Sequence, residues 1–120
     1  MSTPLDTALA FEAAWQGKDF EKARGYLADD VVIDSPFGRD TSAEAVIGQY
    51  IGFTQVVTGA ARVVAAFGDD ESALIMTEIP SVFGPQVSAA RYVVRDGKIT
   101  AETLVYDATA AKSQLSQQQG

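Results

Sequence analysis

The apolar residues near the start of the chain repeat with the period of a helix. They lie about three or four positions apart, in a first group of Ala8, Phe11 and Trp15 and a second group of Phe20, Ala23, Tyr26 and Leu27. Such spacing places each group on one face of a helix. Thr3 and Asp19, just before the two groups, are suitable N-caps. The pattern therefore predicts helices over residues 4–16 and 20–27.

A strand and a third helix are predicted next. Val31-Val32-Ile33-Asp34-Ser35 is a β-branched segment of the kind that forms strands, and Pro36 and Gly38 should end it. Thr41-Ser42-Ala43-Glu44 matches a capping box, and the apolar stripe after it predicts a helix to about residue 57. Gly48 and Gly52 lie four positions apart inside that helix. They indicate either close packing of another backbone or room for a ligand.

The second half of the chain reads as a series of strands. Alternating apolar residues separated by polar turns predict strands over 61–67, 72–79, 86–95 and 99–106. Arg95-Asp96-Gly97-Lys98 is the strongest turn signal and predicts a hairpin. The fold class is therefore α+β, with the helices on one face of a curved, mostly antiparallel sheet. We assign residues 1–107 to a single domain and residues 108–120 to a polar C-terminal tail without a predicted element.

Both faces of the predicted sheet are unusually apolar. In residues 99–106, neither alternate set of side chains is strongly polar, and residues 72–79 show the same pattern. A sheet with one solvated face normally alternates apolar with charged residues. Because the helices can cover only one face, we expect a homodimer through the outer face. The alternative is a neutral but solvated outer face.

The composition of the 120 residues restricts the possible chemistry. The chain contains no cysteine and no histidine, which excludes thiolate and histidine-based catalysis and the usual zinc sites. A net charge of −7 disfavours binding to nucleic acid. We expect no cofactor. We also expect no metal, because a hard cation needs clustered acids and Asp29-Asp30 and Asp69-Asp70 look like turn acids. The sequence shows no leader segment and no apolar run long enough for a membrane span, so the default location is cytoplasmic.

Three segments together resemble the nuclear transport factor 2-like superfamily, most closely its SnoaL-like and ketosteroid-isomerase-like branch. They are the helix end Ala14-Trp15-Gln16-Gly17-Lys18-Asp19-Phe20, the strand Leu27-Ala28-Asp29-Asp30-Val31-Val32-Ile33-Asp34-Ser35-Pro36-Phe37-Gly38, and the closing hairpin Val94-Arg95-Asp96-Gly97-Lys98-Ile99 followed by Val105-Tyr106-Asp107. The resemblance covers residues 4–107. It implies a cone-shaped, cystatin-like roll in which a curved sheet wraps around three helices. It also implies an apolar pocket at the wide end and a dimer through the outer sheet face.

The resemblance also identifies where the isomerase groups would lie. The base precedes the proline that ends the first strand, the tyrosine lies on the first helix, and a protonated acid lies before the last hairpin. The corresponding residues here are Ser35, Phe11 and Ala90. None of them carries the required group, so standard steroid isomerisation is not expected.

Other polar residues remain as candidates for catalysis. Burial would raise the pKa of an inward-facing carboxylate and make it a general acid or base. The candidates are Glu102, Asp34 and Glu78, with Tyr106 to polarise a carbonyl; each carboxylate could instead be an ordinary surface or rim acid. The residues expected to bind the ligand are Phe11, Trp15, Ser35, Tyr50, Phe53, Met76, Ala90 and Tyr92.

Three functional hypotheses follow from these observations. The first is a SnoaL-like, cofactor-independent acid–base enzyme, of isomerase or cyclase type, that acts on a small hydrophobic carbonyl compound. The second is a binding protein for small hydrophobic ligands that performs no chemistry. The third is a dimerisation module without a pocket, for which the cavity should be smaller than roughly 100 Å³. The sequence does not decide whether the chain is an enzyme.

Overall fold

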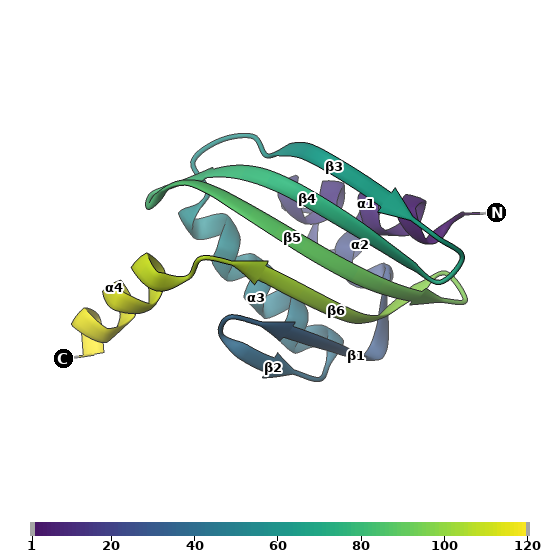
Figure 1. The fold of residues 1–120 in the computed structure, drawn as a ribbon. Coiled ribbons are helices and arrows are strands. Elements are labelled where there is room, and N and C mark those ends of the chain that lie inside the picture. The colour runs from purple at the N-terminus through teal and green to yellow at the C-terminus, as the bar shows by residue number, and fades with distance from the viewer. Residues whose placement is uncertain (1, 120) are drawn as a thin grey trace.

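The computed structural model describes residues 2–119, with side chains described as far as Gln114. The elements in chain order are α1 (Pro4–Gln16), α2 (Phe20–Gly25), β1 (Leu27–Ser35), β2 (Gly38–Asp40), α3 (Ala43–Val56), β3 (Arg62–Gly68), β4 (Ser72–Ser81), β5 (Gly84–Arg95), β6 (Lys98–Tyr106) and α4 (Thr109–Gln119). They form a six-stranded sheet in the order β2-β1-β6-β5-β4-β3 (Figure 1). Only the β1–β6 pair is parallel. The predicted α+β class is confirmed.

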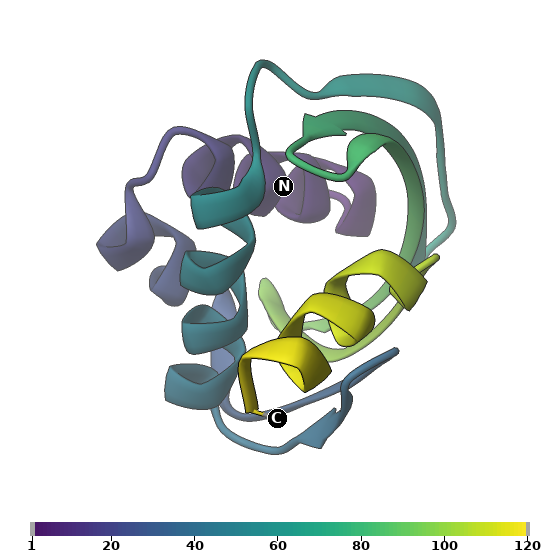
Figure 2. The same cartoon turned by 90° about the vertical axis from the view of Figure 1, so that its left-hand side faces the viewer.

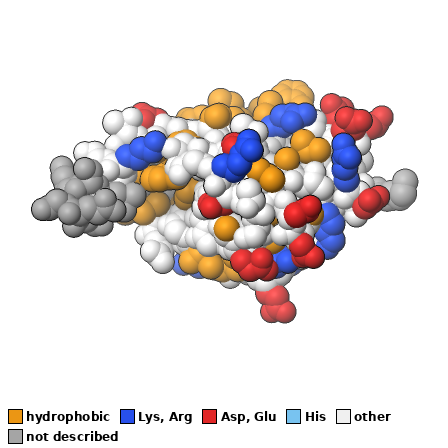
Figure 3. All heavy atoms as spheres, turned by 90° about the horizontal axis from the view of Figure 1, so that it is seen from below, with side chains coloured by type: hydrophobic (Ala, Val, Ile, Leu, Met, Phe, Trp, Pro, Cys, Tyr) orange, Lys and Arg blue, Asp and Glu red, His pale blue; other side chains and the backbone are white. Residues whose placement is uncertain are grey.

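The sheet curves around the helices. In Figure 2, strands β3 to β6 form a curved layer, α1 and α3 lie on the concave side of that layer, and α4 crosses the end of the molecule that faces the viewer. The core between the layers includes Phe11, Val46, Ile75 and Ile99, all essentially inaccessible to solvent. Acidic, basic and apolar side chains are mixed on the face that Figure 3 shows.

The predicted helix starts are confirmed for α1 and α2 and shift by one residue in α3. Thr3 and Asp6 form a reciprocal capping box on α1, and Asp19 accepts a hydrogen bond from the Lys22 amide at 3.1 Å. In α3, Ser42 is the N-cap and accepts from the amide of Ala45 at 3.1 Å. The predicted capping box with Thr41 as the N-cap is therefore wrong. Ser42 takes the N-cap position, because its extended backbone places its own hydroxyl at the start of the helix.

Two elements were not predicted from the sequence. Strand β2 begins at Gly38, whose φ of +111° favours glycine. At this point the chain folds back and pairs antiparallel with β1, so Gly38 starts a new strand as well as marking the end of the first. Helix α4 occupies most of the segment assigned to a tail. Its sequence lacks an apolar stripe, so hydrophobic periodicity gave no signal for it.

The last hairpin determines which side chains of β6 face inward. Asp96 and Gly97 have φ of +51° and +75°, as in a type I′ turn. Beyond it, Val94 pairs with Ile99 and Val93 with Ala101, so Thr100 is an extra, bulged residue. Without the bulge, side chains three residues apart would point to opposite faces of the strand. The extra residue shifts this alternation by one position, so Ile99 and Glu102 both point inward and are buried.

The outer face of the sheet carries a row of small and apolar residues. Ala65, Met76, Ala89 and Val105 lie side by side across β3, β4, β5 and β6. Met76 and Val105 are exposed, as are Phe67 and Leu74 in the next row. The homodimer expected through this face stays a prediction.

Candidate functional site

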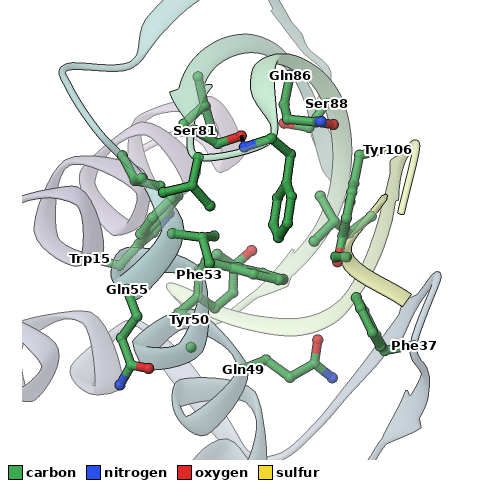
Figure 4. Close-up of a pocket in the computed structure, with 18 of the residues that line it drawn as sticks. Trp15, Phe37, Gln49, Tyr50, Phe53, Gln55, Ser81, Gln86, Ser88 and Tyr106 are labelled. Atoms are coloured by element: carbon green, nitrogen blue, oxygen red, sulfur yellow. Dashed lines mark hydrogen bonds between the residues drawn. The ribbon is translucent and has the colours of Figure 1, made fainter. Parts of the chain in front are cut away.

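A cavity of about 550 Å³ lies between α3, the β4–β5 hairpin, the end of β6 and α4. Apolar side chains provide most of its wall, and they include Trp15, Phe37, Phe53, Val56, Val57, Ile79, Val82, Phe83 and Leu104. Polar groups contribute at several points, namely Glu12, Gln49, Tyr50, Gln55, Ser81, Gln86, Ser88, Tyr106, Asp107 and Gln114 (Figure 4). The volume is typical of small-molecule sites and far above the roughly 100 Å³ limit of the module hypothesis.

The two glycines of α3 lie on the wall of this cavity. A Cβ atom at Gly48 or Gly52 would meet no atom within 4 Å. Close packing of another backbone is therefore not the reason for these glycines. The missing side chains instead leave open space beside α3.

Tyr106 presents a hydroxyl group beside the cavity. Its ring lies 5.8 Å from that of Phe53 and 6.4 Å from that of Phe37, measured between centroids. Its hydroxyl oxygen is buried and has no hydrogen-bond partner within the described residues. Burial raises the pKa of Tyr106 to about 12, so the hydroxyl keeps its proton at neutral pH. This group can donate a hydrogen bond to an acceptor on a ligand.

Glu102 is a buried carboxyl group behind the cavity wall. It is 1% exposed, and its Oε2 accepts a hydrogen bond from the hydroxyl of Tyr50, which lines the cavity. Its Oε1 is buried and has no partner among the residues described. Burial, with a smaller contribution from Glu12, raises the pKa of Glu102 to about 8. Glu102 is therefore mainly protonated at neutral pH.

Glu12 is a second buried carboxylate, and it does line the cavity. It accepts hydrogen bonds from Trp15 Nε1 and Gln16 Nε2, both at 3.1 Å, and from the hydroxyl of Tyr92. Burial raises the pKa of Glu12, while these three donors oppose the rise. Since Glu12 has three donors and Glu102 has one, we assign the negative charge to Glu12 and the proton to Glu102.

The other two candidate carboxylates lie outside the cavity. Asp34 forms an ion pair with Arg39, its cross-strand neighbour, at 2.8 Å, and this hydrogen bonding lowers the pKa of Asp34. Glu78 pairs in the same way with Arg62 across β3 and β4. As candidates for acid–base chemistry in the cavity they are therefore wrong, and the alternative of ordinary surface acids applies, because strand alternation turns both away from the cavity and each meets a cation on the adjacent strand.

The residues expected to bind a ligand divide into three groups. Trp15, Tyr50 and Phe53 line the cavity. Phe11, Ala90 and Tyr92 are buried in the core, and Ser35 donates a weak hydrogen bond to Gln49 at 3.3 Å, so none of these four is part of the cavity wall. Met76 is on the outer face of β4 and 40% exposed, so its predicted contact with the ligand is wrong.

Glu12 is the main residue that the sequence analysis missed. It lies four residues after Ala8 and three before Trp15, so it shares the buried face of α1. An acid at a core position of a helix was the available signal, since such residues are seldom buried without a partner. The α4 residues on the wall, Ala111 and Gln114, had no comparable signal.

A cluster of metal-ligating side chains and a membrane-spanning helix are both absent from the described residues. Among them, no group of three or more acidic side chains is arranged to hold a metal ion. No helix in this part of the chain is long and apolar enough to cross a membrane.

Comparison with known proteins gave clear structural matches. No protein-family model and no curated protein matches the sequence. A "known function protein" from Kribbella flavida DSM 17836 is 32% identical over 100% of both chains, with a TM-score of 0.89. An NTF2-like protein of unknown function from Cytophaga hutchinsonii is 17% identical over 92% of this chain and 96% of the other (TM-score 0.76). An LEH-like epoxide hydrolase from M. tuberculosis is 20% identical over 88% and 84% (TM-score 0.74).

Proposed function

Since this chain has the fold of nuclear transport factor 2-like (NTF2-like) proteins, we propose that its cavity binds a small, neutral, hydrophobic molecule that carries a carbonyl or similar acceptor. One observation carries the proposal: the buried, unpartnered hydroxyl of Tyr106 beside an otherwise largely apolar wall. A buried donor without a partner is costly, and an acceptor on the ligand would satisfy it.

The charges on the wall favour a neutral ligand. The ionisable side chains there, among the described residues, are the acids Glu12 and Asp107 and the phenols Tyr50 and Tyr106. An anionic ligand would have to enter beside the acids without a cation on that wall to pair with. A neutral aromatic or alicyclic ketone avoids this cost and matches the apolar surface.

The proposal is tested with a matched pair of ligands, 2-acetyl-6-methoxynaphthalene and 2-ethyl-6-methoxynaphthalene. They differ mainly in the carbonyl group, and both can be followed by the fluorescence anisotropy of the naphthalene ring. At about 0.3 kcal/mol per heavy atom, the expected dissociation constant of the ketone is on the order of 0.5 mM or tighter. Tyr106→Phe should weaken binding of the ketone by roughly two- to tenfold and leave binding of the ethyl compound unchanged. The proposal fails if neither ligand gives saturable binding to the native protein.

A second candidate function is proton transfer at the carbon next to the carbonyl. It is favoured by the arrangement of an ionised carboxylate, Glu12, on the wall and a neutral acid, Glu102, behind Tyr50. Glu12 would remove a proton from the ligand carbon next to the carbonyl, and the electron pair of that C–H bond would become part of an enolate. Protonated Glu102 would then donate to the Tyr50 oxygen instead of accepting from it, and the freed Tyr50 hydroxyl proton would hydrogen-bond the enolate oxygen. The finding that both oxygens of Glu12 already accept hydrogen bonds favours binding without chemistry.

The proton-transfer function is tested by hydrogen–deuterium exchange. The acetyl methyl protons of the ketone are followed by NMR in D₂O with native protein and with Glu12→Gln. A catalyst exchanges them faster than buffer does, and Glu12→Gln removes the acceleration while ketone binding persists. Exchange at the buffer rate in the presence of bound native protein overturns this candidate.

The exposed row on the outer sheet face supports a proposed homodimer. Ala65, Met76, Ala89 and Val105 form a continuous strip across four strands, flanked by exposed Phe67 and Leu74. Extended apolar strips of this kind are typical of interfaces. A second copy would cover the strip through an isologous contact.

A further inference from the structure

A second cavity, of about 460 Å³, lies next to the first one. It is formed by the end of α1, the end of α3 and the segment before β3. Its lining combines the small residues Gly59, Ala60 and Ala61 with the polar residues Gln16, Lys18 and Thr54. Of the residues described, Trp15, Val57 and Ile79 line both cavities. These three side chains therefore form a partition, with one cavity on each side.

Trp15 is the largest and the most firmly held member of the partition. Its side chain is 3% exposed, and its indole Nε1 donates to Glu12 Oε2 at 3.1 Å. Its ring also packs against Tyr50, with 4.9 Å between centroids. A hydrogen bond at one end and a ring contact on one side fix the orientation of the indole, so thermal motion of the side chain does not readily open the partition.

The partition faces the hydrogen-bond donor proposed for the ligand. Figure 4 shows Trp15 and Tyr106 on opposite sides of the first cavity. A ligand whose carbonyl accepts from Tyr106 therefore extends its other end toward Trp15. Any group attached at that other end meets the indole before it reaches the second cavity.

We infer that Trp15 determines the length of the ligand by closing the first cavity against the second, which would otherwise accept an apolar tail. This inference rests on the proposed function, because it takes the first cavity as the ligand site. It specifies the ligand class as a neutral ring system with an acceptor at one end and at most a short substituent at the other. Long alkyl substituents are excluded by the indole rather than by the total space inside the protein.

The experiment compares 2-acetyl-6-methoxynaphthalene with its 6-octyloxy homologue. Dissociation constants are measured by ligand fluorescence anisotropy for the native protein, Trp15→Ala and Trp15→Leu. Ile79→Ala removes part of the partition while keeping the indole. Leu104→Ala is the matched control, because Leu104 lines the first cavity only and its loss enlarges that cavity without opening the partition.

The readout is the ratio of the two affinities in each protein. In the native protein, the octyloxy compound should bind no more tightly than the methoxy compound, because its added methylene groups find no apolar surface. Burial of only two methylene groups corresponds to roughly a tenfold gain in affinity. The ratio should therefore shift at least tenfold toward the octyloxy compound in Trp15→Ala and Trp15→Leu. It should shift by less in Ile79→Ala, and stay unchanged in Leu104→Ala.

The possible failures are distinguishable. If the native protein binds neither ketone, the proposed function is wrong. If it binds the methoxy ketone but the ratio is the same in all folded variants, or shifts equally in Leu104→Ala, the role of Trp15 is wrong and the proposed function stands. If Trp15→Ala does not fold, Trp15→Leu and Ile79→Ala decide the outcome in the same way.

Discussion

The buried acid Glu102 makes a direct prediction about stability and pH. Its pKa is about 8 in the folded protein, against 4.5 for an exposed glutamate. Between these two values the folded chain holds a proton that the unfolded chain has released. The stabilisation that this proton provides is complete below pH 4.5 and is lost as the pH rises through about 8. The free energy of unfolding should fall by about 1.4 kcal/mol for each pH unit inside that window because of this one group.

Glu102→Gln removes the titration and keeps a partner for the Tyr50 hydroxyl. Unfolding by urea is followed by the fluorescence of Trp15, the single tryptophan in the chain, at several values between pH 5 and 8.5. Relative to Glu102→Gln, the native protein should lose several kcal/mol of stability across this range, and Glu21→Gln on exposed α2 should behave like the native protein. Parallel curves for the native protein and Glu102→Gln would refute the assignment of the proton to Glu102.

Three further predictions concern a helix cap, the outer face and the glycines of α3. Thr3→Ala removes the hydrogen bond from the Asp6 amide to the Thr3 hydroxyl at the start of α1 and should lower the free energy of urea unfolding by about 1 kcal/mol, with Thr3→Ser close to native. Met76→Arg places a charge in the outer row and should convert a dimer to a monomer in light scattering; a native monomer contradicts the proposed dimer. Gly48→Ala should stabilise the protein by about 1 kcal/mol, because a Cβ there meets nothing within 4 Å, and should weaken ketone binding, whereas an unchanged affinity would place the ligand elsewhere.

Local signals explain why most of the fold could be predicted. Thr3 and Asp19 mark helix starts that depend only on neighbouring residues, and Asp96-Gly97 fixes the last hairpin by its own backbone preference. Helix α4 differs because it consists of good helix formers such as alanine, glutamine and lysine without an apolar face. Composition alone does not distinguish such a helix from a polar tail.

The site depends on contacts between distant parts of the chain. Asp34 was a candidate because it neighbours the expected base position at Ser35, and Glu78 because it shares a strand face with apolar Leu74 and Met76. Their cross-strand pairing with Arg39 and Arg62 is decided by the register of the sheet. The charge of Glu12 on α1 also contributes to the raised pKa of Glu102 on β6. No pattern within either segment could predict that these two residues lie close together.

The central proposal for this protein is that the cavity is a ligand site in which Tyr106 donates a hydrogen bond. The most direct measurement is a crystal structure of the protein saturated with 2-acetyl-6-methoxynaphthalene. We expect the naphthalene to lie in the cavity with its carbonyl oxygen about 2.7 Å from the Tyr106 hydroxyl. If a crystal prepared at saturating ketone shows no ketone in the cavity, or shows the carbonyl pointing away from Tyr106, the proposed ligand site is contradicted.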